Sequence, residues 1–377
     1  MRWLERQRNF IDFTLSSLLR RKGKNASLVL VYTLVIFILA SVIFFTQAIK
    51  KEAAIVLAEA PEMVVQRIIA GRHDLIPVNY AEQIKNIRGV TSVRPKLWGY
   101  YFDTIFGANY TLMVPEEFSH EPGNIVIGPG VAKASLGQVD NILPFWTHRG
   151  ALTSFNIVEI LSSDSQLVSA DLILLGEEDF RYLFGIEENF ATDLAVRVRN
   201  PKELPIIAAK IKKILPDTRP IIRDEILRTY DSIFNWRSGL LLVILAGSGL
   251  AFIIFAWDKA SGLSAEEKKE IGVLKAIGWE TSDVILMKFW EGAAISLSSF
   301  LAGLLLAYGH VFFTSSALFE PVLKGWAIIY PEFKLVPYID GYQVAILFCL
   351  TVLPYTVATI VPSWRAAIVD PDSALRT

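Results

Sequence analysis

The residues of this chain that could take part in chemistry form neither a catalytic nor a metal-binding set. The four histidines are widely separated: His73, His120, His148 and His310. None of them has the H-E-x-x-H or H-x-x-E-H spacing that places zinc ligands on one helix face. The carboxylates that could supply a general acid and base are scattered along the middle of the chain: Asp103, Glu116, Glu117, Asp164 and Asp171. They are more simply explained as solvated surface charges, so we expect no metal site and no catalytic residue.

Motifs for nucleotide binding and covalent catalysis are also missing from the sequence. No G-x-x-x-x-G-K-[ST] phosphate loop occurs, so the chain does not bind ATP in the P-loop manner. No G-x-S-x-G elbow occurs, and Gly247-Ser-Gly249 lies in an apolar block, where small residues favour close helix packing. We therefore expect that this chain binds no cofactor and that another polypeptide handles any ATP.

A charged segment at residues 267–283, between two apolar blocks, is the strongest signal for a binding site. Ile271, Leu274, Ile277 and Gly278 recur there at positions i, i+3, i+6 and i+7, which predicts a short helix with an apolar stripe. The stripe would pack on membrane helices, and the charged side would face a soluble partner. The alternative is a solvated connector with no partner.

Composition indicates a membrane protein. The chain has 377 residues, of which 53% are hydrophobic and 20% charged, and its mean hydropathy is +0.41. A helix needs about 20 apolar residues to cross the hydrocarbon layer. Four blocks meet this length and are predicted to span the membrane: 27–48, 237–257, 284–313 and 342–361.

Lys and Arg counts predict the orientation, because short loops rich in them stay cytoplasmic. Residues 1–24 contain seven Lys and Arg, whereas only Lys50 and Lys51 follow the first span closely. The segments expected in the cytoplasm are 1–26, 258–283 and the tail 362–377. Segments 49–236 and 314–341 are then outside. Residues 1–22 resemble an amphipathic helix at the inner interface, with a plain basic flank as the alternative. We expect an uncleaved signal anchor, because the first apolar run exceeds a signal-peptide core.

The segment 49–236 is too long for a loop and predicts an α+β domain. Its alternating patterns suggest strands at 64–69, 89–95, 98–102, 105–114, 124–127, 155–161 and 194–198. Helices are suggested at 79–87, 130–136, 177–184 and 201–215, and a helical stalk at 221–235. We expect two lobes joined near residues 115–150.

Glu291 is an ionisable residue inside the third predicted span. It would lie about 10 Å below the start of that span, where an unpaired carboxylate is costly. Two interpretations have equal weight. Glu291 either pairs with a polar group that ties the cytoplasmic helix to the span, or pairs with Lys288 at i, i+3.

Several motifs in the last third of the chain resemble one family. They are Glu270-Ile-Gly-Val-Leu-Lys-Ala-Ile-Gly278, Ser282-Asp-Val284 with Glu291, and Pro362-Ser-Trp-Arg-Ala-Ala-Ile-Val-Asp-Pro371 with Ala374-Leu-Arg376. These motifs resemble the FtsX-like permeases, which include the MacB-type and LolE-type subunits of ABC transporters. Gly89-Val-Thr-Ser-Val-Arg-Pro95 resembles the outer domain of the family more weakly.

The resemblance implies an α-helical membrane protein with four transmembrane helices and an extracytoplasmic α+β domain inserted between the first and second. It implies a multi-pass protein of the bacterial inner (cytoplasmic) membrane, with both termini cytoplasmic. The expected partners are a separate ATPase that binds ATP and Mg, a second permease copy or a similar permease, and the lipid bilayer. A periplasmic adaptor or lipoprotein is a further partner, and nucleic acid is not expected.

In this family the charged segment would be the coupling helix that docks the ATPase. The residues carried over to that role are Glu267, Lys268, Glu270, Ile271, Gly272, Lys275, Ala276 and Gly278. Among them, Gly272 would permit close approach of the two backbones. ATP hydrolysis would move the coupling helices and, through rigid spans, the outer domain, so that an envelope substrate is exported or extracted. The alternative is a signalling permease that activates an outside partner such as a cell-wall hydrolase. A membrane enzyme is the least favoured class.

Overall fold

A computed structural model describes residues 2–58, 60–136, 141–161, 169–229, 265–321, 328–329 and 335–368. The chain forms two compact units. Unit 1 comprises Met1–Ala48, Asn235–Ser316 and Pro337–Thr377, and unit 2 comprises Ile49–Phe234 and Ala317–Val336. The predicted second span at 237–257 and the last residues of the predicted tail lie outside the described residues.

Unit 1 is built from helices. They are α1 (Arg2–Arg20), α2 (Lys22–Ala58), α9 (Ala265–Ala276), α10 (Thr281–Tyr308) with a π-helical turn at Gly309–Phe313, and α12 (Gly341–Ile368). By length and composition, Asn25–Ile55 and Thr281–Phe313 are able to cross a membrane, and Gly341–Val357 is a shorter apolar helix. The described residues thus contain two candidate spans, and the total of four stays a prediction.

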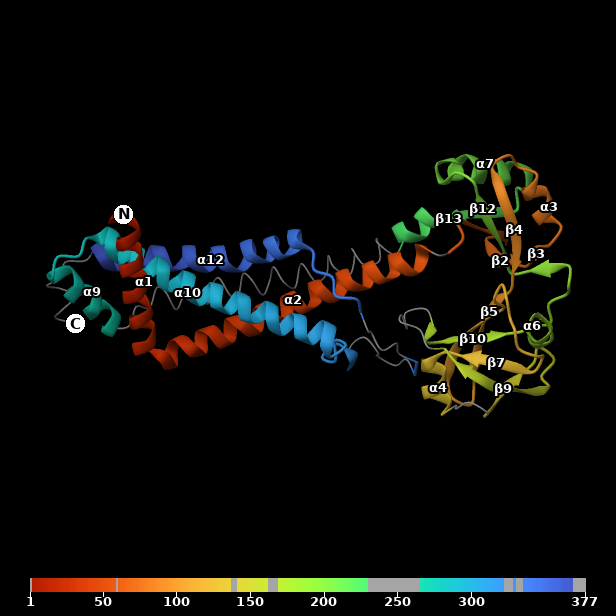
Figure 1. The fold of residues 1–377 in the computed structure, drawn as a ribbon, viewed down its shortest axis with the longest axis horizontal. Coiled ribbons are helices and arrows are strands. Elements are labelled where there is room, and N and C mark those ends of the chain that lie inside the picture. Colours follow the sequence, from red (N-terminus) through yellow and green to blue (C-terminus); the bar gives the residue numbers. More distant parts are fainter. Residues whose placement is uncertain are drawn as a thin grey trace. The chain divides into compact units, whose positions relative to one another are not determined.

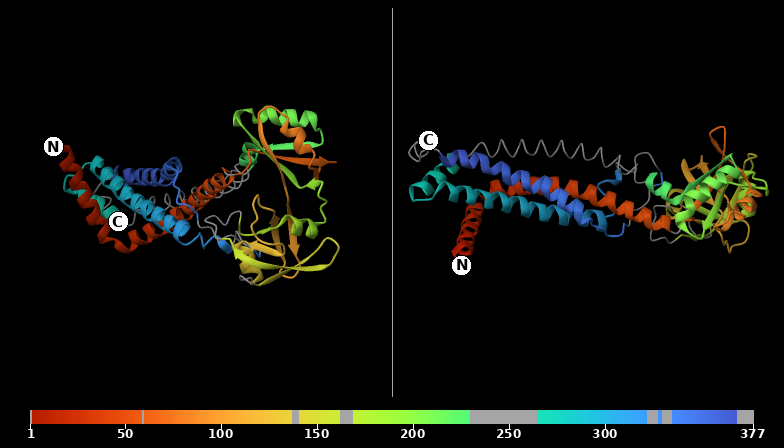
Figure 2. Two further views of the ribbon diagram at one scale, coloured as in Figure 1. Left: turned by 45° about the vertical axis from the view of Figure 1, so that its right-hand side comes forward. Right: turned by 90° about the horizontal axis from the view of Figure 1, so that it is seen from above.

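The membrane helices approach one another closely. A Cβ on Gly303 of α10 would lie 2.7 Å from Ile36 Cγ2 of α2, so only glycine fits at this crossing. The hydroxyl of Tyr32 in α2 donates to the carbonyl of Thr351 in α12 at 2.8 Å. Both α10 and α12 therefore pack on α2, while α1 runs across the direction of α10 and α12 (Figure 1 and Figure 2).

The described part of unit 2 contains two larger sheets, which form two lobes (Figure 1). The first sheet has the order β13-β1-β12-β4, with β2 on β1, and its pairs are antiparallel. Its strands are β1 (Met63–Ile69), β2 (Arg72–Asp74), β4 (Val90–Lys96), β12 (Asp193–Val198) and β13 (Thr218–Ile222). The second sheet is mixed and has the order β5-β6-β10-β7-β9-β8. Its strands are β5 (Trp98–Asp103), β6 (Ala108–Met113), β7 (Asn124–Ile127), β8 (Ile142–Trp146), β9 (Leu152–Ile160) and β10 (Leu172–Leu175).

Short helices and one further strand pair complete unit 2. The strand pair is β3 (Ile76–Pro77) with β11 (Phe190–Ala191). The helices are α3 (Tyr80–Lys85), α4 (Pro129–Ser135), α6 (Glu177–Phe184) and α7 (Leu204–Ile214), preceded by the 3-10 turn Pro201–Glu203. The predicted stalk begins later than expected, because residues 221–222 pair with β1 in β13 and its described helical part starts at residue 223 and runs to residue 229. The rest of the stalk lies outside the described residues.

The predicted junction of the lobes at residues 115–150 is wrong. The described part of that segment lies within the second lobe, because its prolines and glycines form turns between strands of one sheet. The chain crosses between the sheets at Leu97 and returns after α6. At the crossing, the indole Nε1 of Trp98 donates to Asp193 Oδ2 at 2.7 Å, and His73 Nε2 lies 2.9 Å from Asp193 Oδ1. Burial raises the pKa of the Asp193 carboxyl, and both hydrogen bonds oppose this shift.

The segment between α10 and α12 contributes to the core of unit 2. Ile329 packs against that core, and a Cβ on Gly130 at the start of α4 would lie 2.7 Å from Ile329 Cγ2. The neighbouring Ile328 is half exposed. The described part of this predicted outer loop is thus partly a component of the domain.

Replacing Ile329 by Ala is expected to loosen α4, because it removes the side chain that covers Gly130. Amide hydrogen exchange in α4 should become faster by about tenfold or more. Ile328→Ala removes the same atoms from an exposed position and serves as the control. Equal exchange rates in the two variants would contradict the packing of Ile329.

Candidate functional site

The predicted cytoplasmic helix is α9, and a glycine ends it. Gly278 has a φ of +101°, a conformation that residues with a Cβ rarely adopt. The amide of Trp279 donates to the carbonyl of Leu274 at 3.1 Å, and the amide of Gly278 donates to that of Lys275 at 3.0 Å. These two bonds form a Schellman motif, which reverses the chain directly after the helix. Gly278 therefore sets where Trp279 lies.

The apolar stripe predicted for α9 differs from the observed burial at one position. Ile271 and Leu274 are buried as expected, but Ile277 is 69% exposed because the helix ends at Ala276. Trp279, two residues later, packs on Phe10 and Phe13 of α1 instead. The sequence signal for this was Gly278, a typical residue for ending a helix.

The other predicted site residues fall on different sides of α9. Gly272 is buried within unit 1, so its backbone does not lie on the exposed face. Lys269, Val273 and Ala276 are exposed, and Lys275 is partly buried. The side chains of Glu267 and Lys268 lie outside those that the structure describes. The outward face of α9 therefore consists of Lys269, Val273, Ala276 and Ile277.

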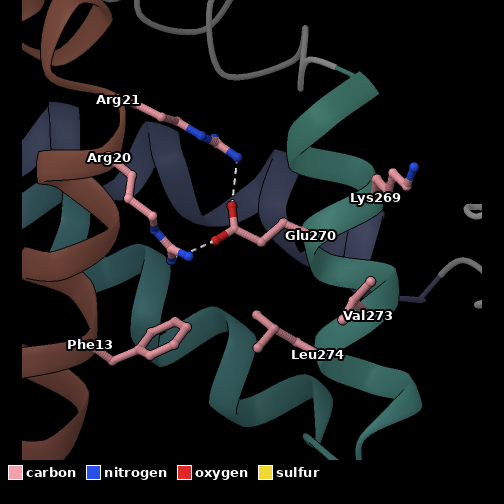
Figure 3. A pocket seen from close by; sticks show the side chains of 7 residues that line it. All are labelled: Phe13, Arg20, Arg21, Lys269, Glu270, Val273 and Leu274. Carbon is pink, nitrogen blue, oxygen red and sulfur yellow. Dashed lines mark hydrogen bonds and ion pairs between the residues drawn. The ribbon is translucent and has the colours of Figure 1, made fainter.

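Glu270 points toward α1 (Figure 3). Its Oε1 lies 3.1 Å from Arg20 Nη2, and its Oε2 lies 2.5 Å from Arg21 Nη2. The three side chains border an open hollow of about 460 Å³ between the two helices. Its lining residues are Phe13, Arg20, Arg21, Lys269, Glu270, Val273 and Leu274. The sequence pattern did not indicate this ion pair, since its partners are 249 and 250 positions apart.

Aromatic contacts join the same two helices a second time. The ring of Trp279 lies 5.5 Å from Phe10 in an edge-to-face arrangement and 5.2 Å from Phe13. The guanidinium of Arg20 lies 5.9 Å from the centre of the Phe13 ring. The apolar side of α1 is thus covered in part by the segment that follows α9.

A capping box starts α10 directly after this segment. Glu280 is the N-cap, and its backbone amide donates to Asp283 Oδ2 at 3.1 Å. The Glu280 side chain in turn accepts from the backbone of the third helical residue. Ser282, part of the family-like motif, donates to Glu280 Oε2 at 3.2 Å. The connection between α9 and α10 is therefore short and ordered by its own hydrogen bonds.

Glu291 is paired within α10. Lys288 Nζ lies 2.6 Å from Glu291 Oε2, and the two side chains are only 10% and 17% exposed. Of the two interpretations considered for Glu291, the structure shows the i, i+3 pair. Each charge balances the other inside the membrane-spanning helix, where an unpaired charge is costly.

Comparisons with known proteins agree with these features. Residues 238–371 match the family model described as FtsX-like permease C-terminal. The lipoprotein-releasing system transmembrane protein LolC of Neisseria meningitidis is 24% identical over 345 residues, which cover 85% of this chain and 78% of that protein. An ABC transporter permease of Methanocaldococcus jannaschii is 24% identical over 162 residues, covering 40% of this chain and 39% of that protein.

Two solved structures also match part of the chain. The periplasmic region of MacB from Actinobacillus actinomycetemcomitans has a TM-score of 0.32 at 10% identity, covering 45% of this chain and 92% of that one. The extracellular domain of the ABC-type transporter YknZ from Gram-positive bacteria has a TM-score of 0.30 at 10% identity, covering 42% and 98%.

Residues 238–371 are thus similar to the C-terminal segment of permease subunits of ABC transporters. The match is to the FtsX-like permeases, so the resemblance of the motifs in this segment to that family is confirmed. Members of the family are inner-membrane permeases, and a permease of this kind implies an ATPase partner.

Breaking the Lys288–Glu291 pair is expected to destabilise the membrane unit. Either Lys288→Met or Glu291→Gln alone leaves the other, largely buried charge without its partner. Each should lower the free energy of unfolding by about 3 kcal/mol or more. The double variant should lose less than the sum of the two, which thermal unfolding in detergent micelles would measure. Leu301→Ala, at an exposed position of α10, is the control. Additive losses would show that the two charges do not interact.

Proposed function

We propose that this chain couples ATP hydrolysis by a separate ATPase subunit to movement of its outer domain, and that this movement exports or extracts an envelope substrate. The observation that carries the proposal is the placement of α9. One side of this helix is buried on its own unit, the other presents Val273 and Ile277, and the capping box of α10 follows directly. A push on α9 would therefore reach a membrane-spanning helix through a short, ordered connection.

The orientation in this proposal follows from the charges of the chain. The basic residues among positions 1–24 support a cytoplasmic location of α1 and α9, where the ATPase would bind ATP and Mg. The outer domain of unit 2 is then on the other side. Two permease copies, or this chain and a similar permease, would work over two ATPase subunits.

The proposed substrate class is a lipoprotein or another lipid-bearing molecule of the envelope. It is supported by the relative whose length this chain largely covers, which is named as part of a lipoprotein-releasing system. The described outer domain is also large, with two lobes and two sheets that could hold such a molecule or a periplasmic adaptor. The membrane-spanning helices would transmit movement rather than form a polar pore.

Replacing both Val273 and Ile277 by Asp is expected to remove the ATPase from the permease. Charged groups would then lie in an apolar contact, and the amount of ATPase that copurifies should fall by about tenfold or more. Ile206→Asp with Ile214→Asp places the same charges at exposed positions of α7 and should leave copurification unchanged. Undiminished copurification with the α9 variant would contradict docking at this face.

Transport is tested with the permease and its ATPase in proteoliposomes that contain a fluorescent triacylated lipoprotein. ATP should release the lipoprotein to an acceptor outside the vesicle, whereas a non-hydrolysable analogue should not. ATP hydrolysis that an outside protein stimulates, with no lipoprotein released, would contradict extraction and favour the signalling alternative.

A further inference from the structure

We infer that α1 positions the coupling helix α9 through a clasp, which consists of Arg20, Arg21 and Glu270. The inference rests on the proposed docking of an ATPase at α9, and it assigns Glu270 a different role from the outward residues. Glu270 would hold α9 in place, while Val273 and Ile277 would contact the ATPase. The N-terminal helix then belongs to the coupling machinery.

The charge geometry of the clasp is the first support. Each oxygen of Glu270 faces a different guanidinium, at 3.1 Å for Arg20 and 2.5 Å for Arg21. The side chains of Arg21 and Glu270 are only 20% and 25% exposed, so water screens their attraction less than that of a surface pair. Because Arg20 and Arg21 already use both oxygens of this carboxylate, Glu270 is poorly placed to bind a further cationic partner.

The contacts of Trp279 are the second support. Trp279 packs against Phe10 and Phe13 beyond the C-terminal end of α9, whereas Glu270 lies in the middle of the helix. A single contact would let α9 turn about it, but two contacts at separate points along the segment restrict its direction relative to α1. Arg20 lies over Phe13 and so links the ionic contact to the aromatic one.

The attachment of α1 to the membrane helices is the third support. The indole Nε1 of Trp290 in α10 donates to Gln7 Oε1 at 3.1 Å. At the bend between α1 and α2, the side-chain Nδ2 of Asn25 donates to the carbonyl of Leu18 at 2.9 Å. The chain then continues through α2, whose residues from Ile49 onward belong to unit 2.

These contacts give α9 two connections to the membrane helices. One runs along the chain through the capping box into α10, and the other runs through the clasp and α1 into α2. Since α2 leads directly into the outer domain, the clasp would carry movement to that domain. A variant that breaks the clasp would then lose this movement although the outward face of α9 still binds the ATPase. Binding of the ATPase and transmission of its movement are therefore separable.

Charge reversal separates the two roles. Glu270→Arg should keep copurification of the ATPase within about twofold, but lower substrate-stimulated ATP hydrolysis by about fivefold or more, the range of ordinary coupling between sites. Adding Arg20→Glu and Arg21→Glu to this variant restores opposite charges and should return stimulation to within about twofold of the unaltered permease. Arg8→Glu, at an exposed position of α1, reverses a charge outside the clasp and is the control. If the Glu270→Arg protein does not accumulate in cells, Glu270→Gln is a smaller change that tests for the same loss of substrate-stimulated ATP hydrolysis.

Three results would overturn the clasp. Loss of ATPase copurification with Glu270→Arg that the reversed arginines do not restore would place Glu270 in the ATPase contact itself. Unchanged copurification and stimulation would show that the ion pair has no part in coupling. Failure of the triple variant to recover stimulation would also contradict the pairing. Failure of the proposed docking would be seen separately, in the variant with Asp at Val273 and Ile277.

Discussion

The hydrocarbon layer requires every backbone group inside it to find a partner within the chain, and the membrane unit follows from this constraint. Long helices meet it, because each amide pairs with a carbonyl of the same segment. Side chains meet it as well, since Lys288 and Glu291 balance each other within one turn of α10. Charges that cannot be paired in this way must leave the layer. They gather in α1 and α9, and this concentration of charge makes that part of the unit suited to bind a soluble protein.

The sequence predicted what depends on local pattern. The strand β7 and the helix α6 have the predicted bounds, since each is a short apolar or amphipathic run between clear turn residues. The strands that were missed are β2, β3, β8, β10, β11 and β13. They are short, and their pairing with other strands, rather than their own pattern, defines them. The lobe junction was misplaced for the same reason, because turns within one sheet and a linker between sheets have similar compositions.

The candidate site shows the same division between local and distant information. Its position, its buried residues Ile271 and Leu274 and its charge were evident from periodicity and from the family-like motif. The direction in which Glu270 points was not, because its partners stand at the other end of the chain. The exposure of Ile277 was missed because a helical period was extended past the residue that ends the helix.

The extent of the family match bears on how such permeases serve different substrates. The match covers residues 238–371, which include α9, α10 and all of α12 but not α1, α2 or the two larger sheets of the outer domain. If this segment docks the ATPase as proposed, it could be combined with outer domains of different sequence, provided that a mechanical connection joins them. In this chain α1 and α2 lie outside the matched segment and contact it, through Glu270, Trp279 and the tight crossing at Gly303. Substrate choice would then depend on residues of the outer domain, while the connection depends on these few contacts near and within the membrane.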